Sequence, residues 1–213
     1  MADVSYTLLN PPVRSAPSAS RSIGGIEPGL AAIGAPEMWA MGYTGHGRIG
    51  MTFDTGLMPD HPAIAGRFLA NFMPLNQTWN PYYSDFPIDK ESSHGTHVTG
   101  TIAGLDPATA DTIGVAFGAS IIANDAIRDF GQTSQYGFSD ILNAYQWAIN
   151  PDGQITTSDD VPDVINNYSC EGASGSNPDC SEVIAAVFSA IEAAGIANVH
   201  SAGNNGPDSA SVS

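Results

Sequence analysis

The sequence predicts an α/β fold in which a mostly parallel sheet carries helices on both faces. Short apolar runs of strand length alternate along the chain with segments whose apolar residues recur at helical spacing. A helix between two strands leaves them parallel, and parallel sheets are covered on both faces. The 213-residue length suits one such domain, or most of one.

The N-terminal part divides near residue 28. Residues 1–28 are rich in Ser, Pro and Ala without a sustained period, so we expect an arm or linker there. Residues 29–213 are expected to form the domain. Its first predicted element is a short helix over 36–42, opened by a proline and closed by a glycine. That helix is expected to pack on the core through three side chains, Met38, Trp39 and Met41.

The first predicted strand, 49–53, is followed by a long proline-rich stretch. Residues 58–86 are expected to be mostly loop, with a short strand near 67–72. Ser93 is placed to cap a helix that runs from His94 to about Gly104. The apolar face of that helix is expected to comprise Val98, Ile102 and Ala103.

The second half of the chain repeats strands and helices. Strands are predicted over 121–127, 164–169 and 196–201. Between them, Ser139 is placed to cap a helix that stops at Pro151, and Ser181 a helix that ends at Gly195. Each of these helices carries apolar residues on one face, as expected for helices that pack on a sheet.

The composition restricts partners and compartment. Apolar residues make up 42% and charged residues 13%, which is typical of a globular chain. Six basic against 22 acidic residues give a net charge of −16, which disfavours nucleic acid as a partner. No apolar run is long enough to span a membrane. The acidic balance suits a protein that works outside the cell or in salt, and we expect an extracellular, secreted protein. Its signal peptide would lie outside this chain, because residues 1–22 lack the pattern of one.

Two side chains that could share a proton lie beside the predicted sheet. Asp54 follows the strand 49–53, at the carboxyl edge where open parallel sheets build their sites. His94 stands at the exposed start of the next helix. An imidazole that takes a proton from a hydroxyl, oriented by a carboxylate, makes up two thirds of a nucleophilic triad.

Three motifs together resemble those of the subtilisin-like serine proteases. They are Asp54-Thr55-Gly56, His94-Gly95-Thr96-His97-Val98 and Ser201-Ala202-Gly203-Asn204-Asn205-Gly206-Pro207. The resemblance implies a subtilisin-like three-layer fold, incomplete at its C-terminus, and serine endopeptidase activity on polypeptides. It assigns His94 as general base, Asp54 as its orienting carboxylate and Asn204 as the oxyanion donor. No nucleophile motif occurs, so the serine is expected downstream of this fragment.

Other interpretations of these residues remain open. Asp-Thr-Gly also occurs in aspartic proteases, but the chain holds a single copy, so only a dimer could complete such a site. His94 and His97 could form a zinc pair, although no Glu stands between them. Asn204 could belong to an Asn-Asn-Gly turn. The rival function is a non-catalytic, subtilase-like module that binds peptides without cutting them.

The resemblance also implies where a substrate would lie. In this family an extended peptide pairs with two strand segments, which here are similar to Gln135-Tyr136-Gly137 and Ser169-Cys170-Glu171. Ser201, Ala202 and Gly203 would line the same pocket. Cys170-Glu171 departs from the usual Leu-Gly, which changes the shape and charge expected there.

Cysteine and metal chemistry are weakly indicated. Cys170 and Cys180 end one polar loop, which suits a disulfide, with two free thiols as the alternative. The acidic residue that follows His-Pro in the family and helps hold calcium is replaced by Ala63. We therefore predict no metal site and no cofactor, with a structural calcium ion as the open alternative.

Overall fold

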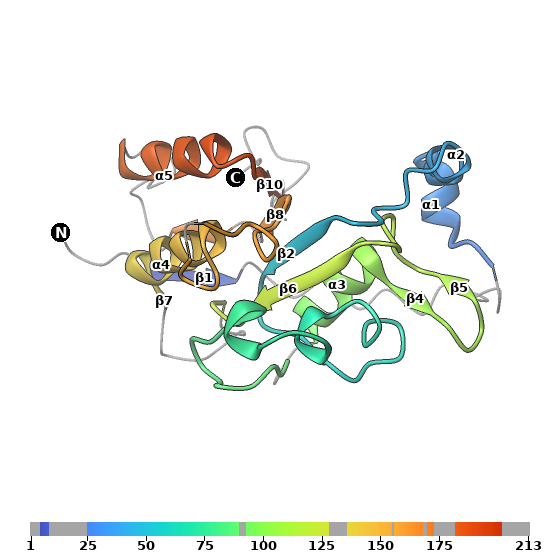
Figure 1. Cartoon of the computed structure of the whole chain (residues 1–213), viewed down its shortest axis with the longest axis horizontal. Coiled ribbons are helices and arrows are strands. Elements are labelled where there is room, and N and C mark those ends of the chain that lie inside the picture. Colours follow the sequence, from blue (N-terminus) through green and yellow to red (C-terminus); the bar gives the residue numbers. More distant parts are fainter. Residues whose placement is uncertain are drawn as a thin grey trace.

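A five-stranded parallel sheet is the central layer of the protein (Figure 1). The computed structural model describes residues 5–8, 25–89, 93–127, 136–154, 156–167, 170–172 and 182–201. The strand order is β10-β8-β2-β6-β3, and each neighbouring pair is parallel. The strands are β2 (Ile49–Phe53), β3 (Trp79–Asn80), β6 (Ser120–Asn124), β8 (Val164–Asn167) and β10 (Ala197–His200).

Helices and two small sheets surround this layer. The helices are α1 (Pro28–Ala32), α2 (Ala35–Ala40), α3 (His94–Ala103), α4 (Phe138–Ile149) and α5 (Glu182–Ala193), with 3₁₀ turns η1 (Leu69–Asn71) and η2 (Leu75–Gln77). One small sheet pairs β4 (Leu105–Asp106) with β5 (Asp111–Thr112). The other has the order β7-β1-β9, with β7 (Tyr136–Gly137), β1 (Ser5–Leu8) and β9 (Cys170–Gly172).

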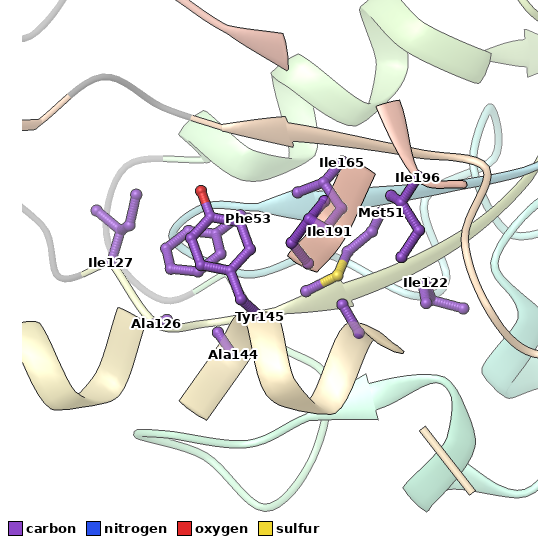
Figure 2. Close-up of a cluster of buried hydrophobic side chains, with 11 residues drawn as sticks. Met51, Phe53, Ile122, Ala126, Ile127, Ala144, Tyr145, Ile165, Ile191 and Ile196 are labelled. Atoms are coloured by element: carbon purple, nitrogen blue, oxygen red, sulfur yellow. The ribbon is translucent and has the colours of Figure 1, made fainter. Parts of the chain in front are cut away.

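The alternation of side chains along β2 places helices on both faces of the sheet. Met51 and Phe53 point into a cluster built with α4 and α5, where Phe53 stacks on Tyr145 with ring centroids 5.7 Å apart (Figure 2). Thr52 points the other way, and its hydroxyl lies 3.1 Å from that of Thr99 on α3. Successive residues of a strand face opposite sides, so both layers follow from one strand. The predicted fold class is confirmed.

The strand register brings the carboxyl ends of three strands to one line. Phe53 is opposite Asn124 of β6 and Asn167 of β8. Residues that follow these positions therefore meet at one edge of the sheet, where Asp54 lies. Asn167 strengthens the alignment because its amide Nδ2 donates to the carbonyl of Val199 on β10 at 3.0 Å.

The strand predicted near 67–72 is wrong. Residues 69–71 form the 3₁₀ turn η1, and Phe68 makes only an isolated bridge to Ile121. The backbone amides here bond locally, from Phe68 to Ile64 and from Asn71 to Phe68, so few remain for a ladder. The strand of this region, β3, lies further on at 79–80.

Helix α3 begins at His94 as predicted, but Ser93 does not cap it through its side chain. Ser93 is in the left-handed region, with φ of 57°, and makes no side-chain cap bond. Thr55 Oγ1 accepts the Gly95 N–H at 3.0 Å and Asp89 Oδ2 accepts the Thr96 N–H at 2.8 Å, so distant residues cap the helix. Its buried face comprises Gly95, Thr96, Thr99 and Ala103, with Ile102 partly buried.

Two further expectations about helices were wrong. Met38 and Met41 at α2 are exposed, by 46% and 64%, and only Trp39 is half-buried, with its indole N–H donating to the carbonyl of Val115. Ser139 lies inside α4, which begins at Phe138, so it is not the cap. The predicted cap Ser181 falls outside the described residues. No helix in the described ranges has the length and apolarity needed to cross a bilayer.

Candidate active site

Asp54 and His94 form a buried pair at the carboxyl edge of the sheet. Asp54 follows β2 and His94 opens α3, and Asp54 Oδ1 lies 2.7 Å from His94 Nδ1. The side chains are 1% and 13% exposed, respectively. A carboxylate at this distance holds the imidazole proton on Nδ1, so that Nε2 carries the lone pair. The pair therefore has the geometry of a general base, His94, and the carboxylate that orients it, Asp54.

The backbone around Asp54 is held by the neighbouring strand. Its N–H donates to Asn124 Oδ1 at 3.3 Å, and its carbonyl accepts the N–H of Ile127 at 3.0 Å. Its Oδ1 also accepts the N–H of Thr55 at 2.7 Å, whereas Oδ2 is buried without a hydrogen-bond partner among the described residues. The carboxylate orientation is thus set by β6 and by its own turn.

Glycines allow the strand end and the helix to approach closely. A Cβ on Gly95 would overlap the carbonyl oxygen of Gly56, and a Cβ on Gly56 would overlap the carbonyl of Ile88. Gly56 also has φ of 118°, which favours glycine. The Asp54 turn and the His94 helix start therefore pack backbone to backbone, which brings the two side chains within hydrogen-bonding distance.

A buried acidic residue that the sequence did not single out lies at the same edge. Asp125 is 4% exposed, and its Oδ1 accepts the N–H groups of Tyr82 at 2.7 Å and Tyr83 at 3.3 Å. Burial raises the pKa of Asp125, and the backbone N–H groups offset part of that rise. The Tyr82 hydroxyl donates to the carbonyl of Asp140 on α4, and burial, with the Asp140 and Asp125 charges, raises the pKa of Tyr82. These hydrogen bonds hold the loop of residues 81–84 next to Asp125 and α4.

The predicted substrate segments lie on either side of the N-terminal strand. Strand β1 pairs antiparallel with β7, with Tyr6 opposite Tyr136, and with β9, with Leu8 opposite Cys170. Strand β1 lies within residues 1–28, where an arm or linker and no strand was expected. The β-branched and aromatic residues around Ser5-Tyr6-Thr7-Leu8 were a usable signal.

Other predicted site residues are described only in part. Ser201 follows β10, is exposed, and its N–H donates to the carbonyl of Asn167 at 3.3 Å, at the same edge as Asp54. The predicted residues that fall outside the described part of the chain are Gln135, Ser169, Cys180, Ala202, Gly203 and Asn204. The predicted Cys170–Cys180 disulfide and the role of Asn204 therefore stay predictions.

The described residues contain no cluster of side chains suited to a metal ion. No group of three or more His, Cys, Asp or Glu side chains among them is placed to hold one ion. His94 already contacts Asp54 through Nδ1, and His97 is exposed one turn further along α3. A zinc site on these two histidines would thus need ligands from residues that the structure does not describe.

Comparison with known proteins identifies the family. The model described as the subtilase family (Peptidase_S8) matches residues 52–213. Bacillopeptidase F of Bacillus subtilis (strain 168) is 35% identical over 174 residues, covering 76% of this chain and 12% of that protein. Subtilisin amylosacchariticus of Bacillus subtilis subsp. amylosacchariticus is 35% identical over 183 residues, covering 86% and 41%. Subtilisin E of Bacillus subtilis (strain 168) is 34% identical over 178 residues, covering 84% and 40%.

The chain belongs to the subtilase family of serine proteases. It spans about two fifths of the length of these two subtilisins, and less of bacillopeptidase F. Further relatives include one named as an intracellular and one named as an extracellular protease. Family membership thus leaves the compartment open.

Proposed function

We propose that this protein is a serine endopeptidase in which His94 acts first as general base and then as general acid. The observation that carries the proposal is the buried contact of 2.7 Å between Asp54 Oδ1 and His94 Nδ1. In such a pair the carboxylate keeps the imidazole in one tautomer and stabilises the imidazolium that forms during reaction. The nucleophilic serine lies on a segment downstream of Ser213, in line with the share of its relatives that the chain spans.

Each proposed role corresponds to one step of acyl transfer. His94 Nε2 takes the proton of the serine hydroxyl while the serine oxygen attacks the scissile carbonyl. The imidazolium later gives that proton to the leaving amine. Asp54 stays ionised throughout. The Asn204 amide donates a hydrogen bond to the oxyanion of the tetrahedral intermediate. The acyl group is then released to water by the same proton transfers in reverse.

The polypeptide substrate is proposed to bind as an added strand. Strand β1 supports this mode, because it pairs antiparallel with β7 on one side and β9 on the other. An extended peptide that replaces β1 between the same two edges would form the same ladders, in which main-chain hydrogen bonds provide affinity for any sequence. In this proposal Gln135 and Ser169 extend the two edges, and the pocket is lined by Cys170, Ser201, Ala202 and Gly203.

The activity test uses the protein extended through its downstream coding sequence. We expect peptide hydrolysis and labelling of one serine by a fluorophosphonate, whereas the 213-residue chain should not react. In subtilisin, loss of the base lowers kcat by about 10⁶ and loss of the orienting carboxylate by about 10⁴. We expect the same order for His94→Ala and Asp54→Ala, and a loss of about 10²–10³ for Asn204→Ala, which removes one donor.

His97→Ala is the matched control, because His97 is exposed on the same helix. It should leave kcat close to the parent value. A parent-like rate for His94→Ala, or labelling of a serine within residues 1–213, would contradict the proposed roles.

The second candidate function is a peptide-binding module without catalysis. The pairing of β1 with both β7 and β9 favours it, because a strand bound there requires no nucleophile. The two candidates separate in the extended protein. A module would bind an extended peptide, leave it uncut and show no labelling by the fluorophosphonate.

We also propose that the protein acts outside the cell. The net charge of −16 and the pair Cys170 and Cys180 support this location. If the two cysteines are bridged, thiol titration of the denatured, unreduced chain should find no free thiol. Two thiols per chain would remove the cysteine argument for an oxidising compartment.

A further inference from the structure

Asp89 contacts both segments that carry the Asp54–His94 pair, although it belongs to neither. It is 6% exposed and lies at the end of the loop that precedes α3. Its two carboxylate oxygens face different partners, one on the Asp54 turn and one on the helix. It lies outside the three motifs on which the family resemblance rests.

The first oxygen is bonded to the residue next to Asp54. Thr55 Oγ1 donates to Asp89 Oδ1 at 3.0 Å, and the same hydroxyl accepts the Gly95 N–H at 3.0 Å. Backbone pairing adds to this link, since Gly56 forms an antiparallel bridge with Asp89. The turn that carries Asp54 is therefore tied both to Asp89 and to the residue after His94.

The second oxygen is bonded to the first turn of α3. Asp89 Oδ2 accepts the Thr96 N–H at 2.8 Å and the Thr96 hydroxyl at 2.6 Å. A carboxylate that accepts an N–H at a helix start is favoured by the helix dipole and by charge-assisted hydrogen bonding. Since Ser93 makes no cap bond, Asp89 supplies the cap at a position two residues after His94.

The charge of Asp89 is satisfied by hydrogen-bond donors. The ion pairs found among the described residues are Arg48–Asp163 and His94–Asp54, and Asp89 takes part in neither. A buried carboxylate with three donors is a rigid link, because moving either segment leaves a buried charge with a lost hydrogen bond. The spacing between the Asp54 turn and the His94 helix start thus depends on Asp89.

We propose that Asp89 is a positioning residue that sets the alignment of His94 with Asp54. The proposal rests on the proposed function, in which this pair works as base and orienting acid. Asp89 touches neither the imidazole nor the Asp54 carboxylate in the contacts above, so it acts through Thr55 and Thr96. A purely structural cap would alter stability alone, whereas a positioning residue also alters the behaviour of His94.

The first test uses the 213-residue chain and needs no catalysis. The low-field ¹H resonance of the His94 Nδ1–H reports its hydrogen bond to Asp54. Asp89→Ala should shift or broaden that resonance, and Asp89→Asn should do so less, because an amide oxygen can still accept the Thr96 N–H. Asp160→Asn is the matched control. Asp160 is also a buried carboxylate, but it precedes β8 and so lies at the opposite edge of the sheet.

The second test uses the extended, active protein. Asp89→Ala should lower kcat by about 10²-fold with little change in KM, as expected when a catalytic group is displaced by about 1 Å. The acidic limb of the pH–rate profile of Asp89→Ala should move to lower pH, because a misaligned Asp54 stabilises the His94 imidazolium less. Asp89→Asn should recover most of the rate, and Asp160→Asn should match the parent.

The outcomes separate the two proposals. An inactive parent, or an active His94→Ala variant, would overturn the proposed function whatever Asp89 does. An active parent whose folded Asp89→Ala variant keeps the parent's kcat, pH profile and His94 resonance would overturn the role of Asp89. If Asp89→Ala does not fold, parent values of all three quantities in Asp89→Asn would overturn it equally.

Discussion

Buried carboxylates at the carboxyl edge of the sheet are held mainly by neutral donors. Asp89 is bonded to two threonines, and Asp125 accepts the N–H groups of Tyr82 and Tyr83. With six basic against 22 acidic residues, the chain has few cations to pair with such groups. For Asp125, burial raises the pKa and the backbone N–H groups lower it, so the two effects act in opposite directions.

Asp125 provides a prediction about pH and stability. Burial raises its pKa above the ordinary 3.8, so the folded state binds this proton more tightly than the unfolded state. The resulting stabilisation is fully present below about pH 4 and is lost as pH rises through the folded pKa. The free energy of unfolding should fall along this range, and less so in Asp125→Asn. Asp160, whose pKa is raised by burial and then by the Asp152 charge, acts in the same direction.

Urea denaturation between pH 4 and 7 measures this effect. Asp60→Asn is the control, because Asp60 is exposed and its replacement changes the net charge equally. If the free energy of unfolding depends on pH equally in Asp125→Asn and in the parent, Asp125 is not the source of the predicted pH dependence.

At the scale of elements, the contact between the turn after β2 and the start of α3 determines the site. Gly95 packs its backbone on that of Gly56, and the neighbouring carbonyl of Ile88 closes over Gly56. Small residues line the buried face of α3, so the helix lies close to the sheet. The catalytic arrangement that we propose depends on this close approach more than on the apolar face expected from the sequence.

Gly95→Ala should lower the free energy of unfolding and displace His94. The added Cβ would overlap the Gly56 carbonyl, and overpacking of this kind typically costs about 1–3 kcal/mol. Gly100→Ala is a matched control in the same helix, because a Cβ there meets nothing within 4 Å. It should raise stability by about 0.5–1 kcal/mol through helix propensity. Urea denaturation of both variants checks the prediction, and equal effects would contradict it.

At the scale of the whole molecule, the small sheet β7-β1-β9 joins three segments that are far apart in the chain. Strand β1 is central in this sheet, so each of its N–H groups faces one neighbour or the other. The five-stranded sheet has its own strand ladders and an apolar cluster with residues from β2, β6, β8, α4 and α5. Because the described pairings of β1 are with β7 and β9, changes in β1 should act mainly on the small sheet.

Thr7→Pro should open the small sheet and leave the large one intact. Proline removes a donor and disfavours a central strand position. Amide hydrogen exchange should speed up at 136–137 and 170–172, while β2, β6 and β8 keep their protection. Thr7→Ala, which keeps the N–H, is the control. Unchanged exchange in β7 and β9 would show that β1 does not protect them.

Local patterns determined the elements of this protein. The strand at 49–53 follows from a short apolar run, and the helix start at His94 from residues near in sequence. The strand predicted over 164–169 is present over 164–167, the part of it that the structure describes before residue 170. The order of Asp54 and His94, with the motifs around them, indicated the family and a common site. Those motifs were sufficient to place Asp54 at a strand end and His94 at a helix start, because both features are set by short segments of sequence.

Only the tertiary structure decided which distant groups meet. The 2.7 Å contact of Asp54 with His94, the cap that Asp89 provides and the pairing of β1 between β7 and β9 join segments with no shared local pattern. For the same reason the Ser93 cap, the strand near 67–72 and the packing of Met38 were predicted wrongly. Capping, pairing and burial are decided by which partners the packed chain brings near, whereas periodicity records only which face of an element is apolar.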